Sequence, residues 1–545
     1  MKLADQTVAI IDCQTTGANP RDSYLLELGW MVGSASAPGT VESRLIALPE
    51  DASLPPRIAR ITGIGAEELL SASAPADVLE EFVGALSQVQ SGLAVAHYAR
   101  FEESFLRDFF DCNSGRETLP VSFICTCEIA KRLYPDLPSR AIRALVGYFG
   151  LTIGEMKRAS CHVQATFHIW RRLVSDLADQ GIETPEQLTS WLQSPRPKKV
   201  ERSYELPMER LKRLEMPDQP GVYHMLSSTG QILYVGKATS LKDRVNSYFR
   251  GRKGKDSKTK ELISQIFDIR VEILETPLEA ALRETDLIKL HDPPYNRALR
   301  QRGRQLIFFS RDFSLQSSSQ SREVYLGPFC NDAMQPLLDL QTALSSASFD
   351  PALFWGLVPE EMGLSAMQSF LQLYSLSAEK TTVRGLLALG MRMLREELRQ
   401  QALAEVMDEE TELEPEAEIE PEAESESESE SEDDDQEELQ EADVLAMICG
   451  ILVRSARLLR QCRELTGLLN ATVSFVDRGK ERTLYFSRGS QVAAPKKAKG
   501  VSFPPWSGLQ IDSYDRMRVL STELTRVGGS VRIAENWWIS QVKRS

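Results

Sequence analysis

The chain has 545 residues, which is long for one domain and predicts about three or four. Its formal net charge of −15 would argue against binding to nucleic acid if the acidic residues were evenly spread. Residues 408–443, however, hold 21 of the 78 acidic residues and no Lys or Arg, so the rest of the chain has 57 acidic against 63 basic residues. The net charge therefore excludes no DNA-binding function.

The cysteine pattern and the apolar runs predict the compartment. The eight cysteines include no Cys-Xaa-Xaa-Cys pair, which favours reduced thiols over a disulfide framework or a zinc site. No basic segment followed by an apolar one stands at the N-terminus, and the longest apolar run, 444–453, is too short to cross a bilayer. We expect a soluble cytoplasmic protein that does not enter the membrane.

Residues 1–180 read as an α/β domain. The apolar run 7–12 predicts a buried strand, and 93–97 predicts a second one. Amphipathic helices are predicted over 78–86 and 102–110. Strands that alternate with helices favour a sheet covered by helices.

Four segments of this domain, 12–17, 61–64, 97–102 and 157–166, resemble the DnaQ-like 3′–5′ exonucleases, the fold of the DNA polymerase III epsilon subunit. The resemblance implies an RNase H-like fold. It also implies four carboxylates that hold two divalent ions, and a His that activates the attacking water. The positions to which those five roles fall are Asp12, Gln14, Glu102, Lys157 and His162.

These five positions have lost most of the expected residue types. Only Asp12 is unchanged, since the second Glu has become Gln14 and the second-motif Asp has become Glu102. Lys157 stands for the general-base His, and His162 stands for the last Asp. A neutral amide cannot bridge two metal ions, and a lysine ammonium repels them. We predict a domain without exonuclease activity that docks DNA or protein; an active exonuclease is the alternative if the third motif is assigned in the wrong register.

His97 and His162 are also candidates for a metal site of a new kind. An isolated His beside an apolar strand is more often a hydrogen-bonded structural residue, and no cysteine spacing supports zinc. The structural interpretation is therefore favoured. After this domain the periodicity weakens, and 181–216, with its Pro-rich basic stretch 194–199, is predicted to be a linker.

Residues 217–300 carry the most chemical information. Gly221-Val222-Tyr223 and Tyr234-Val235-Gly236 predict two short strands, followed by a helix over 241–249 and a second helix over 279–289. The segment resembles the GIY-YIG nuclease domain, most closely the form found in the UvrC excinuclease and its shorter homologue Cho. Seven positions match in order: Tyr223, Tyr234, Lys237, Arg244, Tyr248, Glu284 and Asn296.

The resemblance implies a role for each of the seven. Glu284 would hold one Mg²⁺ or Mn²⁺ ion at the scissile phosphate. Tyr223 is the favoured general base, with the positive charge of Lys237 favouring its phenolate. Arg244 would contact the phosphate, because its planar fork suits phosphate oxygens. The other three residues would orient the water, the base and the loop.

A basic cluster follows the first helix of this segment. Between Lys237 and Arg270 there are ten basic residues and four acidic ones. Such a cluster neutralises phosphates and makes DNA affinity fall with salt, although a charge run is often only a solvated face. The candidate DNA-binding residues are Arg250, Arg252, Lys253, Lys255, Lys258 and Lys260.

The C-terminal half is less informative. Residues 301–407 are expected to form a helical extension like that of UvrC and Cho, with a Gly-Pro-Phe turn at 323–329 and helices over 333–344 and 383–407. Residues 408–443 are predicted to be disordered, as a spacer or as an arm that mimics DNA.

Residues 444–545 are predicted to hold a helix and a small β-containing region. The helix 444–469 is expected to pair with 383–407 across the acidic tract, and 472–476 with 483–486 predict a hairpin. Trp537-Trp538 is expected to pack in this region. The tail resembles neither a helix-hairpin-helix nor the second nuclease domain of UvrC.

The sequence thus predicts a multidomain α/β protein: an RNase H-like domain, a small α/β nuclease domain and a mixed C-terminal region with a disordered insert. The resemblance implies a metal-dependent endonuclease that nicks damaged DNA in nucleotide excision repair, as Cho-like proteins do, within the SOS response to DNA damage. UvrA and UvrB are the implied protein partners. The alternatives are a nuclease for branched or structured DNA outside excision repair and a non-catalytic DNA-binding adaptor.

Overall fold

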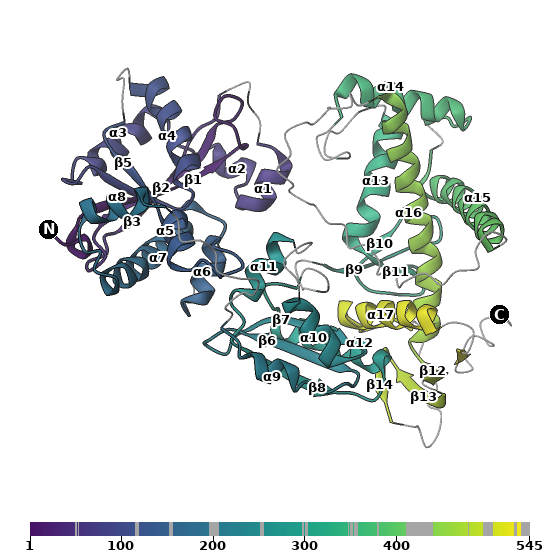
Figure 1. Cartoon of the computed structure of the whole chain (residues 1–545). Coiled ribbons are helices and arrows are strands. Elements are labelled where there is room, and N and C mark those ends of the chain that lie inside the picture. The colour runs from purple at the N-terminus through teal and green to yellow at the C-terminus, as the bar shows by residue number, and fades with distance from the viewer. Residues whose placement is uncertain are drawn as a thin grey trace. The chain divides into compact units, whose positions relative to one another are not determined.

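The computed structural model describes residues 1–535 except 50–51, 53, 115–118, 152–155, 196–206, 251–255, 297–298, 300–303, 347, 349–352, 354–357, 379–380, 410–439, 478, 494–504 and 528–530 (Figure 1). The chain forms two compact units. The first comprises Met1–Met216, His224–Tyr234 and Lys242–Arg270, and the second comprises Pro217–Tyr223, Val235–Leu241 and Val271–Ser545.

The N-terminal domain is built on a five-stranded mixed sheet of order β3-β2-β1-β4-β5. Its strands are β1 (Val8–Thr15), β2 (Leu25–Gly33), β3 (Val41–Leu45), β4 (Leu93–Ala96) and β5 (Ser122–Cys125). Strand β1 is antiparallel to β2 and parallel to β4. The strands predicted at 7–12 and 93–97 are thereby confirmed.

Helices cover both faces of this sheet, which explains the continuous apolar run in β1. Val8 and Ile10 join the core on one side, and Ala9 and Ile11 join the core on the other, as the two-residue repeat of a strand requires. The core around Ala9 includes side chains of α3 (Pro75–Leu86) and α4 (Ala99–Ser114), the two helices predicted in this region. The core around Val8 includes side chains of α5 (Thr126–Leu133), α6 (Ile142–Tyr148) and α7 (Ala159–Asp179). Two short helices, α1 (Pro56–Thr62) and α2 (Ala66–Leu69), follow β3 in the chain.

The stretch 181–216, predicted to be a linker, contains two helices. Helix α8 (Pro185–Gln193) begins at a Thr184 cap and buries Leu188 in the core around Val8. Helix α9 (Arg210–Leu214) lies against the next domain, where Arg213 donates to Asn246 Oδ1 at 3.2 Å. Each helix belongs to a folded neighbour, since each has side chains that make such contacts.

The predicted nuclease segment forms a three-stranded sheet of order β7-β6-β8 with three helices, and its predicted strands and helices are confirmed. Gly221 opens β6 where a Cβ atom would lie 2.3 Å from the Glu272 carbonyl oxygen, so no larger residue fits. The elements are β6 (Gly221–Leu226), β7 (Ile232–Ala238), α10 (Leu241–Phe249), α11 (Ser257–Ile263), β8 (Asp268–Ile273) and α12 (Pro277–His291).

The region expected to be a helical extension begins with a sheet instead. Strands β9 (Leu306–Phe309), β10 (Gln316–Ser317) and β11 (Leu326–Cys330) take the order β10-β9-β11. The Gly-Pro-Phe stretch expected to be a turn lies inside β11, because Phe329 and Cys330 still pair with β9 after an irregularity in the register. That pairing buries Phe329, which explains why the chain continues as a strand.

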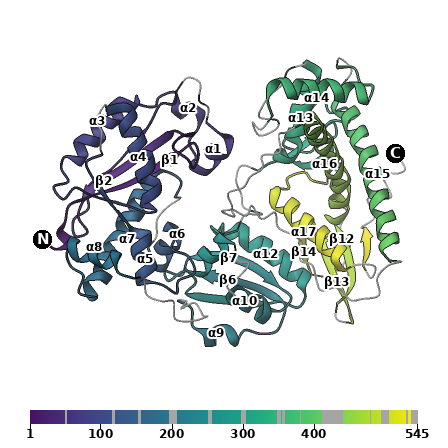
Figure 2. The same cartoon turned by 45° about the horizontal axis from the view of Figure 1, so that its top comes forward.

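Four helices follow: α13 (Asn331–Ser346), α14 (Glu360–Leu373), α15 (Val383–Glu409) and α16 (Glu441–Leu468). The predicted pairing of α15 with α16 is confirmed, and the two helices run side by side in Figures 1 and 2. At their contact Gly390 lies so close to Leu452 that a Cβ atom would stand 2.3 Å from its carbonyl oxygen. Most of the acidic tract, 410–439, lies outside the described residues.

The C-terminal region holds a four-stranded sheet of order β14-β13-β12-β15. The predicted hairpin is confirmed as β12 (Ala471–Asp477) and β13 (Lys480–Ser487), joined by β14 (Ser490–Val492) and β15 (Arg532–Glu535). Helix α17 (Ile511–Val527) packs against α12 and α16. Trp537-Trp538 lies outside the described residues.

Two further observations bear on the expected compartment. All eight cysteines, Cys13, Cys112, Cys125, Cys127, Cys161, Cys330, Cys449 and Cys462, are free. Within the described ranges, every helix is too short or too polar to span a bilayer.

Candidate active site

Strand β7 and helix α12 bring together two of the seven matched residues. Glu284 lies midway along α12 and is half-buried. Its Oε1 accepts a hydrogen bond from the backbone N–H of Lys237 at 3.0 Å. A carboxylate that accepts from a backbone N–H is fixed in orientation and is stabilised in its charged form.

Asn296 anchors the same strand from the end of the matched segment. Its Oδ1 accepts from the Val235 N–H at 3.0 Å, and its Nδ2 donates to the Val235 carbonyl at 2.8 Å. Only 7% of Asn296 is exposed. The amide thus satisfies both backbone groups of one β7 residue, as a neighbouring strand would.

A residue outside the seven matched positions also contacts Lys237. The Lys237 Nζ forms an ion pair with Glu523 of α17, whose side chain is 13% exposed. Arg526, one turn further along α17, pairs with the same carboxylate oxygen at 3.1 Å. Sequence reasoning missed Glu523 because no motif links it to Lys237 across 286 residues.

The other matched residues include three from the first unit and Tyr223 from the second. The rings of Tyr234 and Tyr248 lie edge to face with centroids 6.3 Å apart, and the Arg244 guanidinium lies 5.4 Å from the Tyr248 ring centre. Tyr223 is fully buried, with 0% of its surface exposed. The role of Tyr223 as general base stays a prediction, and in this structure the side chain has no exposed surface from which to meet a water molecule. Tyr234, in contrast, is half-buried.

The basic cluster is only partly described. Arg252, Lys253 and Lys255 lie outside the described residues. Arg250 is exposed just after α10, and Lys258 and Lys260 are half-buried on α11. These three described residues therefore remain candidates for phosphate contacts.

The N-terminal domain gathers a second cluster, around Asp12 on β1. The Gln14 amide donates to Asp12 Oδ2 at 3.0 Å, and His162 Nδ1 lies 3.2 Å from Asp12 Oδ1. Glu102 is buried nearby, and its charge interacts with that of Asp12. Lys157 lies two residues before the start of α7.

A buried carboxylate missed in the sequence fixes His162. Glu27 of β2 is 3% exposed and accepts from the Ala159 N–H at 2.9 Å and from Arg158 Nε at 3.1 Å. These bonds satisfy the first turn of α7, one turn before His162. Glu27 therefore holds the N-terminal end of the helix that carries His162.

Burial and charge set the protonation of this cluster. Burial raises the pKa of Asp12, although the charge of His162 opposes the shift. Burial also raises the pKa of Glu102 well above its ordinary range, and the charge of Asp12 adds to it. For His162, burial alone would lower the pKa, but the Asp12 carboxylate outweighs it and raises the pKa. The neighbours of Asp12 are therefore an imidazole and an amide, and burial favours the neutral forms of Asp12 and Glu102, where a metal centre would need ionised carboxylates.

His97 is a buried neutral group. It is 3% exposed, its Nδ1 lies 2.8 Å from Thr126 Oγ1, and burial lowers its pKa to about 3. Among the residues described, no three His, Cys, Asp or Glu side chains stand together in a way that could hold a metal ion.

Comparison with known proteins identifies two domains. Residues 219–297 match the family model of the UvrC-like GIY-YIG domain, and residues 9–160 match the exonuclease family model. The chain therefore contains a UvrC-like GIY-YIG domain that follows an exonuclease-type domain with an RNase H-like fold.

The similarity to each of these relatives covers only part of the relative's own length. A Mycobacterium tuberculosis protein, provisionally named as a bifunctional exonuclease/endonuclease, is 30% identical over 54% of this chain and 45% of its own. The UvrABC system protein C of a Psychrobacter species is 44% identical over 22% of this chain and 21% of its own. The magnesium-bound GIY-YIG domain of Thermotoga maritima UvrC is 31% identical over 16% of this chain and 94% of that domain, with a TM-score of 0.15. The chain thus spans less than half the length of the curated relatives named here.

Proposed function

Because the chain contains a UvrC-like GIY-YIG domain, we propose that it is a metal-dependent DNA endonuclease whose active site includes Glu284 and Lys237. The contact of the Glu284 carboxylate with the Lys237 backbone carries the proposal. It fixes the position of the one acidic residue among the seven matched positions.

A divalent cation fits the residues present. Mg²⁺ and Mn²⁺ prefer hard oxygen ligands, and Mg²⁺ is commonly held by one or two carboxylates together with waters and substrate phosphates. Glu284 supplies one such carboxylate, oriented by its bond to Lys237. The bound ion would supply charge stabilisation at the phosphate and at the leaving oxygen.

The remaining side chains provide binding and proton transfer. Arg244 binds the phosphate, since its guanidinium lies beside Tyr248 and its fork suits phosphate oxygens. Lys237 is the other basic residue of the matched set and supplies positive charge to the reaction. A tyrosine of the matched set, Tyr223 or Tyr234, accepts the proton of the attacking water; Tyr223 is fully buried and Tyr234 is half-buried.

The proposed biological reaction is incision of damaged DNA in nucleotide excision repair, with UvrA and UvrB as partners. The similarity of the matched segment to UvrC supports this assignment. The cluster of Arg250, Lys258 and Lys260 supports DNA as the substrate. We further propose that the Asp12 cluster is catalytically inactive and that the N-terminal domain serves to bind DNA or protein.

Purified protein with Mg²⁺ or Mn²⁺ tests both proposals. We expect nicking of a duplex with one defined lesion in the presence of UvrA and UvrB, and loss of nicking by at least a hundredfold in Glu284→Gln. The substituted amide can still accept the Lys237 N–H, so DNA binding should persist.

The same preparation supplies the controls. Cleavage that survives in Glu284→Gln would reject the site, and cutting of branched DNA without UvrA and UvrB would reject the repair assignment. Release of nucleotides from a 3′-labelled single strand that stops in Asp12→Ala would show an active exonuclease and reject the inactive assignment.

A further inference from the structure

Helix α17 reaches the proposed nuclease site from well outside the matched segment, which ends at residue 297. Its residue Glu523 forms an ion pair with the Lys237 ammonium, and the Glu284 carboxylate accepts the backbone N–H of the same residue. Lys237 is therefore held at both ends by carboxylates from two different helices.

The apolar side of α17 packs against α12. Met517, Leu520 and Leu524 share one buried core with Leu278 and Leu282 of α12. Two helices that bury such a core are difficult to separate, because separation exposes the apolar surface of both to water. This core therefore indicates that α17 is a fixed part of the nuclease domain, and that it is no lid.

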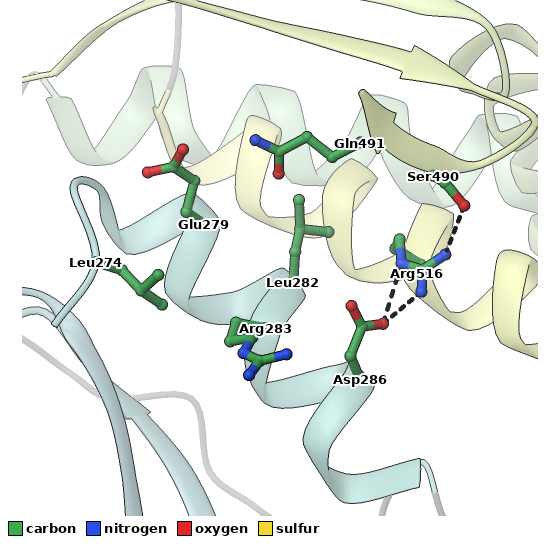
Figure 3. A pocket seen from close by; sticks show the side chains of 8 residues that line it. All are labelled: Leu274, Glu279, Leu282, Arg283, Asp286, Ser490, Gln491 and Arg516. Carbon is green, nitrogen blue, oxygen red and sulfur yellow. Dashed lines mark hydrogen bonds and ion pairs between the residues drawn. The ribbon is translucent and has the colours of Figure 1, made fainter. Parts of the chain in front are cut away.

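Charged groups on α17 reinforce this docking. Asp515, only 1% exposed, accepts from Lys289 at 2.9 Å and from Arg304 at 2.8 Å. Arg516 reaches Asp286 of α12 at 3.1 Å, and Figure 3 shows this pair beside Ser490. A buried charge that loses a partner is strongly destabilising, so the two pairs of Asp515 hold the helix in one place.

The spacing along α17 places Glu523 on the same face as the docking residues. Asp512, Arg516 and Glu523 are separated by four and then seven residues, which corresponds to one side of an α-helix. Asp512 and Arg516 contact α12 through Lys289 and Asp286. The face that docks on α12 thus also presents Glu523 to Lys237.

Resting on the proposed function, we propose that Glu523 is a positioning residue that holds the Lys237 ammonium in place for the reaction. A lysine side chain has four rotatable bonds and loses conformational freedom when it binds a phosphate. An ion pair with a largely buried carboxylate on a fixed helix orders that side chain before the substrate arrives. The C-terminal region thereby completes the nuclease site.

Steady-state nicking kinetics measure this role, with Asp512→Asn as a matched control on the same helix. Asp512 pairs with Lys289 of α12 at 2.8 Å and stands eleven residues before Glu523 in the helix. We expect Glu523→Gln to lower kcat about tenfold with KM within about twofold of the wild type, and Asp512→Asn to leave both nearly unchanged. In a Lys237→Met background, Glu523→Gln should have no further effect, because the group on which it acts is gone.

Three results would overturn the proposal. A rise in kcat in Glu523→Gln would mean that the carboxylate restrains the lysine. An equal loss in Asp512→Asn, or a full further loss in the Lys237→Met background, would mean that the helix only supports the fold.

A second measurement separates this proposal from the proposed function. Acetylation of Lys237 by acetic anhydride, followed by peptide mass spectrometry on the full chain, should be several-fold faster in Glu523→Gln than in the wild type or Asp512→Asn. Unchanged labelling rejects the ion pair even where the wild type nicks DNA. If labelling is faster in Glu523→Gln but the wild type does not nick DNA, the proposed nuclease function is rejected, and with it any role of Glu523 in catalysis.

Discussion

The carboxylates of Asp12 and Glu284 stand in two nuclease-type domains but meet opposite surroundings. Asp12 is 5% exposed, accepts from the Gln14 amide at 3.0 Å and faces His162 at 3.2 Å. Glu284 is half-buried and accepts from a backbone N–H of the strand that holds Lys237. In the first domain, the side chains of Gln14 and His162 lie within hydrogen-bonding distance of the carboxylate. In the second, a backbone N–H orients it.

If the Asp12 cluster is inactive, as we propose, the difference explains how a nuclease fold persists after its metal site is lost. A buried carboxylate needs compensating charge or hydrogen bonds, and it makes no difference to the fold whether a cation or protein groups supply them. Gln14 supplies a donor, and His162 lies 3.2 Å from Asp12, whose carboxylate acts to raise the pKa of the imidazole. Both groups act on the Asp12 carboxylate without a metal ion.

Restoring the lost carboxylates tests this interpretation with the largest expected effect. Gln14→Glu adds a carboxylate beside Asp12 and Glu102, and without a metal this should cost about 3 kcal/mol of stability. In the double variant with His162→Asp, Mn²⁺ should recover most of this loss, because the cation pairs with the carboxylates. Hydrogen exchange of peptides from residues 1–194 measures both effects.

The control for this experiment is the Glu284→Gln background, in which the second cation site is removed. There, Mn²⁺ should protect the N-terminal peptides of the double variant and leave those of the otherwise unchanged chain as they were. Protection of both would show that the Asp12 cluster still binds a metal ion.

Asn296 tests the second domain. Asn296→Ala removes both hydrogen bonds to Val235 and leaves a buried N–H and carbonyl unpaired, at a local cost of about 1–3 kcal/mol. Faster hydrogen exchange in 232–238 and nicking at least tenfold slower are expected, because this strand holds Lys237. Asn296→Asp keeps the acceptor for the Val235 N–H, so its nicking rate should lie between those of the wild type and Asn296→Ala. A full nicking rate in Asn296→Ala would mean that the strand does not depend on this anchor.

Much of the fold could be predicted from local pattern. The apolar run of β1 indicated a strand buried on both faces, and α12, α15 and α16 had helical spacing over several turns. Short elements between domains were missed, since α8 buries only Leu188 and α9 has no buried residue. Strand β11 was missed because Gly327-Pro328 is typical of a turn, whereas pairing with β9 depends on distant residues.

The site residues likewise fall into those that the sequence could predict and those that it could not. The seven matched positions lie within one short segment, where motif spacing is informative. Glu523 comes to Lys237 through the docking of α17, which no local pattern encodes. The burial of Tyr223 likewise results from tertiary packing, so the sequence could not rank it against Tyr234.

Two histidines near the Asp12 cluster should respond to acid with opposite signs. The pKa of His97 falls from 6.5 to about 3 on folding, so the stability it contributes is present above pH 6.5 and is lost as pH falls toward 3. Between pH 7 and pH 5 this loss is about 2 kcal/mol. The pKa of His162 is raised, so its contribution is present below pH 6.5 and is lost as pH rises through its folded pKa.

Denaturant unfolding of the full chain at pH 7 and pH 5, followed by hydrogen exchange in residues 1–194, measures the change in stability between the two pH values. His97→Gln should reduce the loss of stability on acidification, and His162→Gln should increase it. An equal change in stability in the wild type and both variants would mean that neither imidazole titrates as its surroundings require.

The smallest effect is expected from single basic residues of the second domain. If Lys260 contacts a phosphate, Lys260→Ala should reduce the slope of log affinity against log salt by about one, with a severalfold loss of affinity at moderate salt. Lys2 offers a matched control in the exonuclease-type domain, where it is exposed and pairs with Glu183. Filter binding of a labelled duplex between low and moderate salt gives the slope. A lower slope in Lys2→Ala with none in Lys260→Ala would place the DNA on the exonuclease-type domain, and the domain that lost its metal site would then be the one that binds the substrate.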